Sequence, residues 1–265
     1  MRRATAMPPT EPGTDTDGED TLDLALPAEL RELAELREPL EPCPGPASEA
    51  KPKAEGERKA EVTVPVRRLR ASVGDHDLLD NVAEWGPTTT PHGIFQLVPA
   101  VVSRDLPLIT RWMNDPAVAE FWQLSGPPAI AEKHLREQID GDGRSVPCLG
   151  MLDGTPMSYW EIYRADLDPV SRYYPVRPND TGIHMLIGPV ADRGRRLGSA
   201  LLRTVADLVL DHRPGCVRVI AEPDLRNIPS VAAFLAAGFR FAAEIELPEK
   251  RAALVIRDRT LRHLL

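Results

Sequence analysis

The chain has 265 residues, of which 42% are apolar and 27% are charged, and its formal net charge is -8. That length allows one large domain or two small ones with a buried core. No apolar run is long enough to span a membrane, and none follows Arg2 and Arg3 as it would in a secretory signal peptide. The negative net charge argues against a nucleic-acid partner, because phosphate binding needs a basic surface. The three cysteines lack the spacing of a zinc site and cannot all form disulfides with one another. Together these observations predict a soluble cytoplasmic protein without a metal.

The first part of the chain has the composition of a disordered segment. Residues 1–60 hold 9 of the 27 prolines and 14 acidic against 8 basic side chains, and the first aromatic residue is Trp85. Such a stretch buries too little apolar surface to offset the entropy of ordering it. We expect a solvated tail, and the alternative is that leucines at helical spacing within 30–36 form a short amphipathic helix on contact with another molecule. We interpret residues 61–92 as a linker of uncertain order.

From 93 to 265 the pattern becomes that of a folded domain in which strands and helices are mixed. The Asp153-Gly154 pair between two apolar runs predicts a β-hairpin, and Ser103 is a candidate N-cap for the first helix. The expected strands cover 94–102, 146–152, 155–165, 182–188, 216–222 and two segments within 239–258, and the expected helices cover 103–115, 129–139, 196–212 and 228–239. The fold class is therefore α/β or α+β, a mixed sheet with helices on its faces.

The segment between the strand at 182–188 and the helix at 196–212 has the features of an anion-binding loop. It holds Arg193, Gly194 and Gly198. A helix N-terminus presents unpaired N–H groups and a partial positive charge, and glycine lets the backbone come close to a phosphate group. Many α/β proteins contain such a loop, so alone it does not specify a ligand.

A second segment makes the pattern specific, because Asn227 begins the helix at 228–239 and Gly238 follows eleven residues later. The two segments together resemble the GNAT family of acyl-coenzyme A-dependent N-acyltransferases. Arg196 stands where the family's loop has its middle glycine. Phe234 replaces the tyrosine that often protonates the leaving thiolate, so that role cannot be carried over. The resemblance implies that acyl-coenzyme A binds at Ile187, Arg193, Gly194, Arg195, Arg196, Gly198, Asn227 and Phe234.

Five motifs, WMNDPAVAEFWQ, YWEIY, DTGIHMLIGP, EPDLRN and LPEKRAAL, are similar to the siderophore-biosynthesis branch of this family over about 93–260. Those enzymes acylate N-hydroxylated lysine, ornithine or cadaverine side chains to hydroxamates that bind iron. The resemblance implies the GNAT fold with a mostly antiparallel sheet, acetyl- or succinyl-coenzyme A as cosubstrate, a small hydroxylamine acceptor and no metal. The first 90 residues lie outside it, and a pathway enzyme is the partner that we would expect for the N-terminal tail.

His184 is the residue that we expect to act as general base. It alternates along its strand with Ile183 and Met185, so it points to the opposite face, and imidazole takes up protons near neutral pH. The siderophore branch is understood to use this histidine. Glu222 and Asp224 end the next strand, where ligands of α/β sheets collect, and either can orient the histidine or hold the hydroxylamine. Asp224 can instead cap the following turn, and the sequence leaves the choice open.

Aromatic and amide side chains concentrate in the segments expected to flank the acceptor. Because side chains alternate between the two faces of a strand, about half of them belong to the core. Asp180 either contacts an acceptor amine or only ends its loop. Lys250 is expected to be solvated, and contact with a substrate carboxylate is the alternative. The remaining candidates are Trp122, Gln123, Tyr159, Trp160, Glu161 and Tyr163. Two alternatives stay open: acetylation of an aminoglycoside or other primary amine, and a degenerate domain that binds acyl-coenzyme A without turnover.

Overall fold

The computed structural model describes residue 79 and residues 81–264. The chain divides into two units, 1–67 and 68–265, and all described residues belong to the second. The tail predicted over 1–60, with its amphipathic helix, lies outside the described residues. Among the helices of the described part, none is long and apolar enough to cross a membrane.

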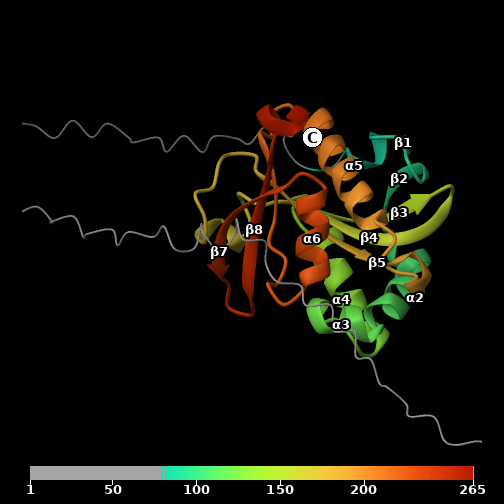
Figure 1. The fold of residues 1–265 in the computed structure, drawn as a ribbon. Coiled ribbons are helices and arrows are strands. Elements are labelled where there is room, and N and C mark those ends of the chain that lie inside the picture. The colour runs from blue at the N-terminus through green and yellow to red at the C-terminus, as the bar shows by residue number, and fades with distance from the viewer. Residues whose placement is uncertain (1–78, 80, 265) are drawn as a thin grey trace, which may run out of the picture. The chain divides into compact units, whose positions relative to one another are not determined.

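An eight-stranded sheet forms the centre of the described unit, in the order β1-β2-β3-β4-β5-β6-β8-β7 (Figure 1). All neighbouring strands are antiparallel except β5 and β6, which are parallel. The strands are β1 (Thr88–Thr90), β2 (Gly93–Pro99), β3 (Ser145–Leu152), β4 (Thr155–Arg164), β5 (Thr181–Ile187), β6 (Arg218–Ala221), β7 (Arg240–Glu246) and β8 (Arg251–Asp258). The expected mixed, mostly antiparallel sheet is confirmed.

Five α-helices flank the sheet in the part of the chain that the structure describes. They are α2 (Val102–Met113), α3 (Pro116–Trp122), α4 (Pro128–Ile139), α5 (Leu197–His212) and α6 (Ile228–Ala236), with short 3-10 segments η2 (Val82–Glu84), η3 (Pro169–Arg172), η4 (Val190–Asp192) and η5 (Arg259–Leu264). The sequence did not predict α3, which starts because the Asp115 carboxylate accepts the Ala117 N–H and Pro116 occupies the first helical position. The cap expected at Ser103 is wrong, since α2 already begins at Val102.

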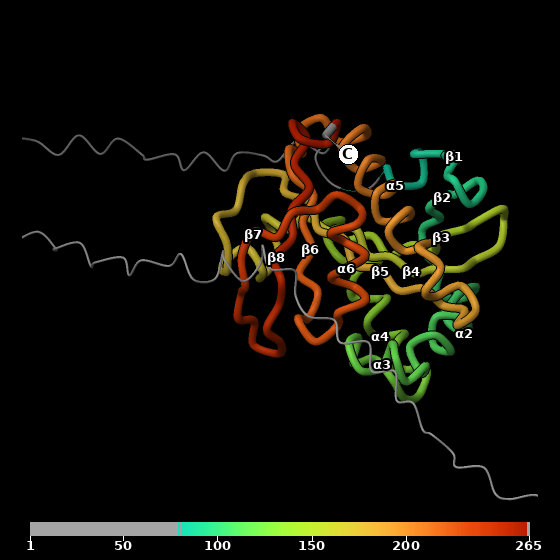
Figure 2. Tube along the Cα trace, viewed as in Figure 1, coloured from blue at the N-terminus to red at the C-terminus, as the bar shows by residue number. Residues whose placement is uncertain are grey.

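Side-chain alternation on β4 and β5 sorts the core into two layers. Trp160 and Ile183 pack with α5 and α6, whereas Tyr159 and Leu186 pack with α2 and α4. Figures 1 and 2 show α5 and α6 in front of the sheet, with α2, α3 and α4 gathered at the lower end of the view. The two faces of β5 therefore meet different helices.

The β3–β4 hairpin turns where the sequence predicts. Asp153 and Gly154 have φ values of 47° and 77°, the left-handed conformation that a tight two-residue turn needs at both positions. The turn is held by Asp153 Oδ1, which accepts the Ile94 N–H of β2 at 2.8 Å. The hairpin thus fixes β2, β3 and β4 in one register.

The folded unit starts earlier than the sequence suggests. Leu79, Val82 and Trp85 are 0%, 1% and 6% exposed and belong to the main core, and the Trp85 ring stacks on His212 of α5 at 5.4 Å. In addition, β1 pairs with β2. The described end of the segment 61–92, interpreted above as a linker, is therefore part of the domain.

β5 and β6 pair over only two positions, Thr181 with Val219 and Gly182 with Ile220. Beyond them β5 continues to Ile187, whereas β6 ends at Ala221. The sheet therefore opens between these two strands.

Candidate active site

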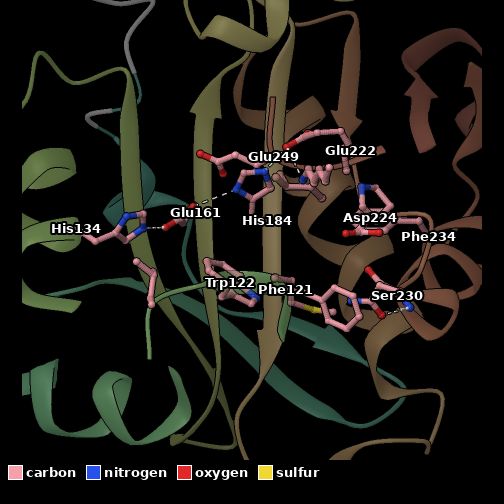
Figure 3. Close-up of a pocket in the computed structure, with 17 residues that line it drawn as sticks. Phe121, Trp122, His134, Glu161, His184, Glu222, Asp224, Ser230, Phe234 and Glu249 are labelled. Carbon is pink, nitrogen blue, oxygen red and sulfur yellow. Dashed lines mark hydrogen bonds and ion pairs between the residues drawn. The ribbon is translucent and has the colours of Figure 1, made fainter. Parts of the chain in front are cut away.

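A cavity of about 310 Å³ occupies the opening between β5 and β6 (Figure 3). Ile183 and Met185 line it from the α5 and α6 side of the sheet, and His184 lines it from the opposite side. The cavity therefore connects the two faces. The other lining residues are Phe121, Trp122, Leu124, His134, Glu161, Ala221, Glu222, Pro223, Asp224, Asn227, Ser230, Phe234, Glu249 and Lys250.

His184 lies between two buried carboxylates, as the dashed line to Glu161 in Figure 3 illustrates on one side. Glu161 is its direct partner in the β4–β5 register, so both side chains point to the same face, and Oε2 of Glu161 is 3.0 Å from Nδ1 of His184. Oε1 of Glu222, just beyond β6, is 2.5 Å from Nε2. Both ring nitrogens are thus hydrogen-bonded to carboxylates, while the imidazole stays 33% exposed.

Glu161 is held by three further side chains. Its Oε1 lies 2.5 Å from Nε2 of His134, accepts the Gln138 amide at 2.8 Å and accepts the Tyr159 hydroxyl at 3.0 Å. His134 and Gln138 were not among the site residues predicted from the sequence. Their spacing of four in the helix at 129–139 puts both on one face, which is a usable signal, but only packing shows which strand that face meets.

Glu222 has its own set of partners. The Tyr163 hydroxyl donates to Oε2 at 2.8 Å, and Nζ of Lys250 lies 3.7 Å from Oε1. Lys250 was expected to be solvated but is only 28% exposed and lines the cavity. Asp224 lines the same cavity, yet it accepts the Arg226 N–H at 2.8 Å and pairs with that guanidinium at 2.7 Å. Of the two carboxylates left open by the sequence, Glu222 contacts His184.

The charges of these groups alternate. Burial by itself lowers the pKa of His184, but the Glu222 charge and the hydrogen bonds to both carboxylates outweigh it and raise that pKa to about 10. Burial alone would raise the pKa of Glu222, and the charge and hydrogen bond of His184 instead lower it to about 2. The pKa of Glu161 is likewise lowered, against its burial, by His134 and His184. Both carboxylates therefore favour the protonated, imidazolium form of His184.

The loop before α5 adopts the backbone that a glycine-rich loop needs. Gly194 has φ 72°, and a Cβ atom there would meet nothing within 4 Å. Arg196, in place of the family's glycine, is left-handed at φ 58°. Gly198 lies in the first turn of α5, where an added Cβ would be 3.5 Å from Met185 and from Ile187. This helix start therefore adjoins the cavity through Met185.

Arg193 fixes this loop to the end of β5. Its guanidinium donates to the carbonyl oxygens of Ile187 at 3.0 Å and Gly188 at 2.9 Å, and to Asp115 at 2.9 Å. Arg195 is 71% exposed and lies 3.5 Å from Asp192. The side chain of Arg193 is thus used within the protein, while that of Arg195 reaches outward.

Two of the expected cosubstrate residues line the cavity from α6. Asn227 caps that helix by accepting the Ser230 N–H at 3.2 Å, and Phe234 packs edge-on against Phe239 at 5.1 Å between ring centres. Both face the opening between β5 and β6. The structure thus brings them together with His184 and Glu222.

The predicted acceptor residues separate into two groups. Trp122 lies edge-on to Tyr159 at 5.5 Å and to His184 at 6.1 Å, and so joins Glu161 and Tyr163 at the site. Gln123 is exposed and lines neither this cavity nor the one described below.

Trp160 and Asp180 were predicted to contact the acceptor, and the structure places both away from the site. Trp160 is fully buried on the other face of β4, where its indole donates to Ser158 at 2.8 Å, because alternation puts Glu161 and not Trp160 on the His184 face. Asp180 is fully buried in an ion pair with Arg218 and accepts the Tyr174 hydroxyl at 3.1 Å. Neither side chain lines the site.

A second cavity, of about 550 Å³, adjoins the first. The two share His134, Glu161 and His184. From there the second cavity extends past Tyr163 on β4 to the residues before β3. His184 therefore lies where two cavities meet.

Comparison with known proteins gives a consistent picture. An acetyltransferase (GNAT) domain family model matches residues 101–247. The chain is 35% identical over 166 residues to lysine N-acyltransferase MbtK of Mycobacterium sp. (strain MCS), covering 63% of this chain and 68% of that protein. It is also 35% identical over 155 residues to the N(6)-hydroxylysine O-acetyltransferase of Escherichia coli, covering 58% of this chain and 49% of the other.

Among solved structures, the aminoglycoside acetyltransferase AAC(6')-Ib in complex with coenzyme A and kanamycin has a TM-score of 0.58. The alignment covers 64% of this chain and 98% of that one at 22% identity, which is a likeness of fold. The matched family region contains β5, the loop before α5, α6 and both partners of His184. The chain therefore belongs to the acetyltransferase (GNAT) domain family.

Proposed function

We propose that this protein transfers an acyl group from acyl-coenzyme A to the nitrogen of an N-hydroxylated lysine-, ornithine- or cadaverine-type amine, giving a hydroxamate for siderophore biosynthesis. The observation that carries the proposal is His184, set between Glu161 and Glu222 where two cavities meet. The names of the two relatives above, a lysine N-acyltransferase and an N(6)-hydroxylysine O-acetyltransferase, support the substrate class.

The acyl donor fits the opening between β5 and β6. The start of α5 offers free backbone N–H groups and the positive end of a 16-residue helix for a pyrophosphate, and the open space at Gly194 leaves room for it. The exposed Arg195 adds positive charge near this loop. From there the pantetheine arm would enter the 310 Å³ cavity past Asn227 and Phe234 and reach His184.

The charge state of the site supports a relay in which His184 starts protonated. The hydroxylamine nitrogen attacks the thioester carbonyl and gives its proton to Glu222, while His184 gives its proton to the departing thiolate sulfur. The proton on Glu222 then passes to Nε2 of His184 across the 2.5 Å contact, which restores the starting state. In this relay Glu222 takes the place of His184 as the base. His184 is instead the acid that protonates the thiolate, a role that Phe234 cannot have because it carries no acidic group. Asp224 would then act only as a wall of the cavity.

The same charge state disfavours a primary amine as acceptor. An alkyl amine is protonated at neutral pH and must lose a proton before it attacks. His184 is already protonated, and Glu222, with its pKa lowered to about 2, is too weak a base to take a proton from an alkylammonium group. A hydroxylamine is much less basic, so it is already neutral. A degenerate binding domain would have no use for the paired His184 and Glu222.

The test is thiol release from acetyl- and succinyl-coenzyme A by the purified protein. The acceptors are N6-hydroxylysine, N5-hydroxyornithine, N-hydroxycadaverine, lysine and kanamycin, and ferric ion is added to the product. We expect turnover with a hydroxylamine but not with its parent amine, and a coloured ferric hydroxamate. A colourless product would mean acylation on oxygen, turnover with kanamycin alone would move the protein to primary amines, and coenzyme A binding without any turnover would favour the binding domain.

A further inference from the structure

The second cavity has a charged far end. Arg144 and Asp142 line it there, just before β3, and Asp168 lines it from the start of η3. The Arg144 guanidinium donates to Asp142 Oδ1 at 2.8 Å and to the Leu167 carbonyl oxygen at 3.0 Å. Both partners of the ion pair are about half exposed, at 50% and 58%. An exposed ion pair holds its partners weakly, so a ligand with both charges can take their place at small cost.

The strand register gives the separation between His184 and Arg144. Glu161 is the register partner of His184, and the Arg164 N–H donates to the Arg144 carbonyl oxygen at 2.8 Å. Arg144 therefore lies three residues further along the sheet and two strands across from His184. At the usual rise and strand spacing each offset is about 10 Å, which places the two backbones about 14 Å apart. An aliphatic chain of lysine length, together with the reach of an arginine side chain, spans that separation.

We propose that this cavity binds the acceptor, and that Arg144 binds an α-carboxylate while the neighbouring carboxylates bind an α-ammonium group. The acceptor is then an ω-N-hydroxy-α-amino acid, with its hydroxylamine at His184, rather than an N-hydroxylated diamine, which has no carboxylate to offer Arg144. This inference rests on the proposed function. The subsite would bind the end of the acceptor that takes no part in the reaction.

N6-Hydroxylysine and N-hydroxycadaverine form a matched pair of probes, since they differ only in the α-carboxylate. For the full chain we expect kcat/KM to favour N6-hydroxylysine by about fivefold, the upper end of the range for an ion pair at a half-exposed arginine. Arg144→Gln should remove that preference through the KM of hydroxylysine, with kcat and the values for N-hydroxycadaverine little changed. Arg144→Lys should restore part of it.

Arg136→Gln is the matched control, because Arg136 is also about half exposed and ion-paired, to Glu132, but lines neither cavity. Equal use of both probes by the unmodified protein, or the same effect from Arg136→Gln and Arg144→Gln, would overturn the proposal. Calorimetry with both probes in the presence of coenzyme A separates the two hypotheses. If hydroxylysine binds more tightly than N-hydroxycadaverine and Arg144→Gln abolishes that difference, the subsite is supported even when no turnover occurs. The lack of turnover would then count only against the proposed reaction. Equal binding of the two probes, or no binding of either, would reject the subsite.

Discussion

The two junctions that β5 makes with its neighbours differ in extent. On one side β4 pairs with it over seven positions, from Ser158 with Ile187 to Arg164 with Thr181. On the other side β6 pairs with it over two. The continuous junction fixes Glu161 opposite His184, whereas the short one leaves the opening that Glu222 borders. Full pairing therefore sets the geometry of the histidine, and the interruption of pairing gives a ligand access to it.

Truncation tests how much the folded domain depends on the core residues that precede β1. Deletion of residues 1–86 removes Leu79, Val82 and Trp85 from the core, and each loss of a buried side chain of this size costs about 2–5 kcal/mol. We expect that variant to be unfolded or strongly destabilised in thermal melts. Deletion of residues 1–77 leaves all three in place and should melt close to the full chain. Equal melting temperatures for the two deletions would contradict this assignment.

Substitution at the opening should strongly lower kcat without changing the fold. Glu222→Gln keeps the shape but cannot accept a proton, and His184→Gln cannot donate one, so each should lower kcat by about 10²–10⁴. Asp224→Asn is the comparison, because Asp224 lines the same cavity but pairs with Arg226, and it should cost less than tenfold. Steady-state rates with circular dichroism as a folding control check this. A larger loss from Asp224→Asn than from Glu222→Gln would reverse the assignment.

Gly198 tests whether the opening receives coenzyme A. A Cβ atom at this position makes ordinary contacts of 3.5 Å, so Gly198→Ala should fold normally. Gly198→Asp adds a negative charge at the start of α5, where a pyrophosphate would bind, and should weaken coenzyme A binding by more than about tenfold. Calorimetric titration measures both. Unchanged affinity in the aspartate variant would place the pyrophosphate elsewhere.

The protonation of His184 can be measured directly by nitrogen NMR of the imidazole. Because its pKa is raised to about 10, the ring should remain protonated from pH 6 to 8, whereas a histidine with the ordinary pKa of about 6.5 would lose its proton there. Glu222→Gln removes the charge that contributes most to the increase, so the pKa should fall. If the relay operates, kcat should decline only as the pH rises toward 10. Titration of His184 near pH 6.5 in the unmodified protein would restore the simple base role.

The smallest effect is expected at Arg196. A non-glycine residue at φ 58° costs on the order of 1 kcal/mol, so Arg196→Gly should raise the melting temperature by a few degrees. Arg195→Gly is the control, because Arg195 is not left-handed and gains nothing from glycine. A similar rise for both variants would mean that charge, and not backbone strain, is responsible.

Local patterns in the sequence were enough for the hairpin, α5, α6 and the orientation of His184, because turn chemistry and strand alternation decide them. They were not enough for Trp160 and Glu161. Alternation puts only one of these neighbours on the histidine face, and the β4–β5 register decides which. His134 escaped notice because its contact with Glu161 depends on how α4 packs on the sheet. Asp180 was misassigned because Arg218, its buried partner, lies 38 residues away.

The meeting of two cavities at His184 also has a consequence for the order of events. If donor and acceptor arrive through different openings, both can be bound at once, and the acyl group never has to wait on a protein side chain. Double-reciprocal plots should therefore intersect rather than run parallel, and coenzyme A should remain bound until the acyl group has moved.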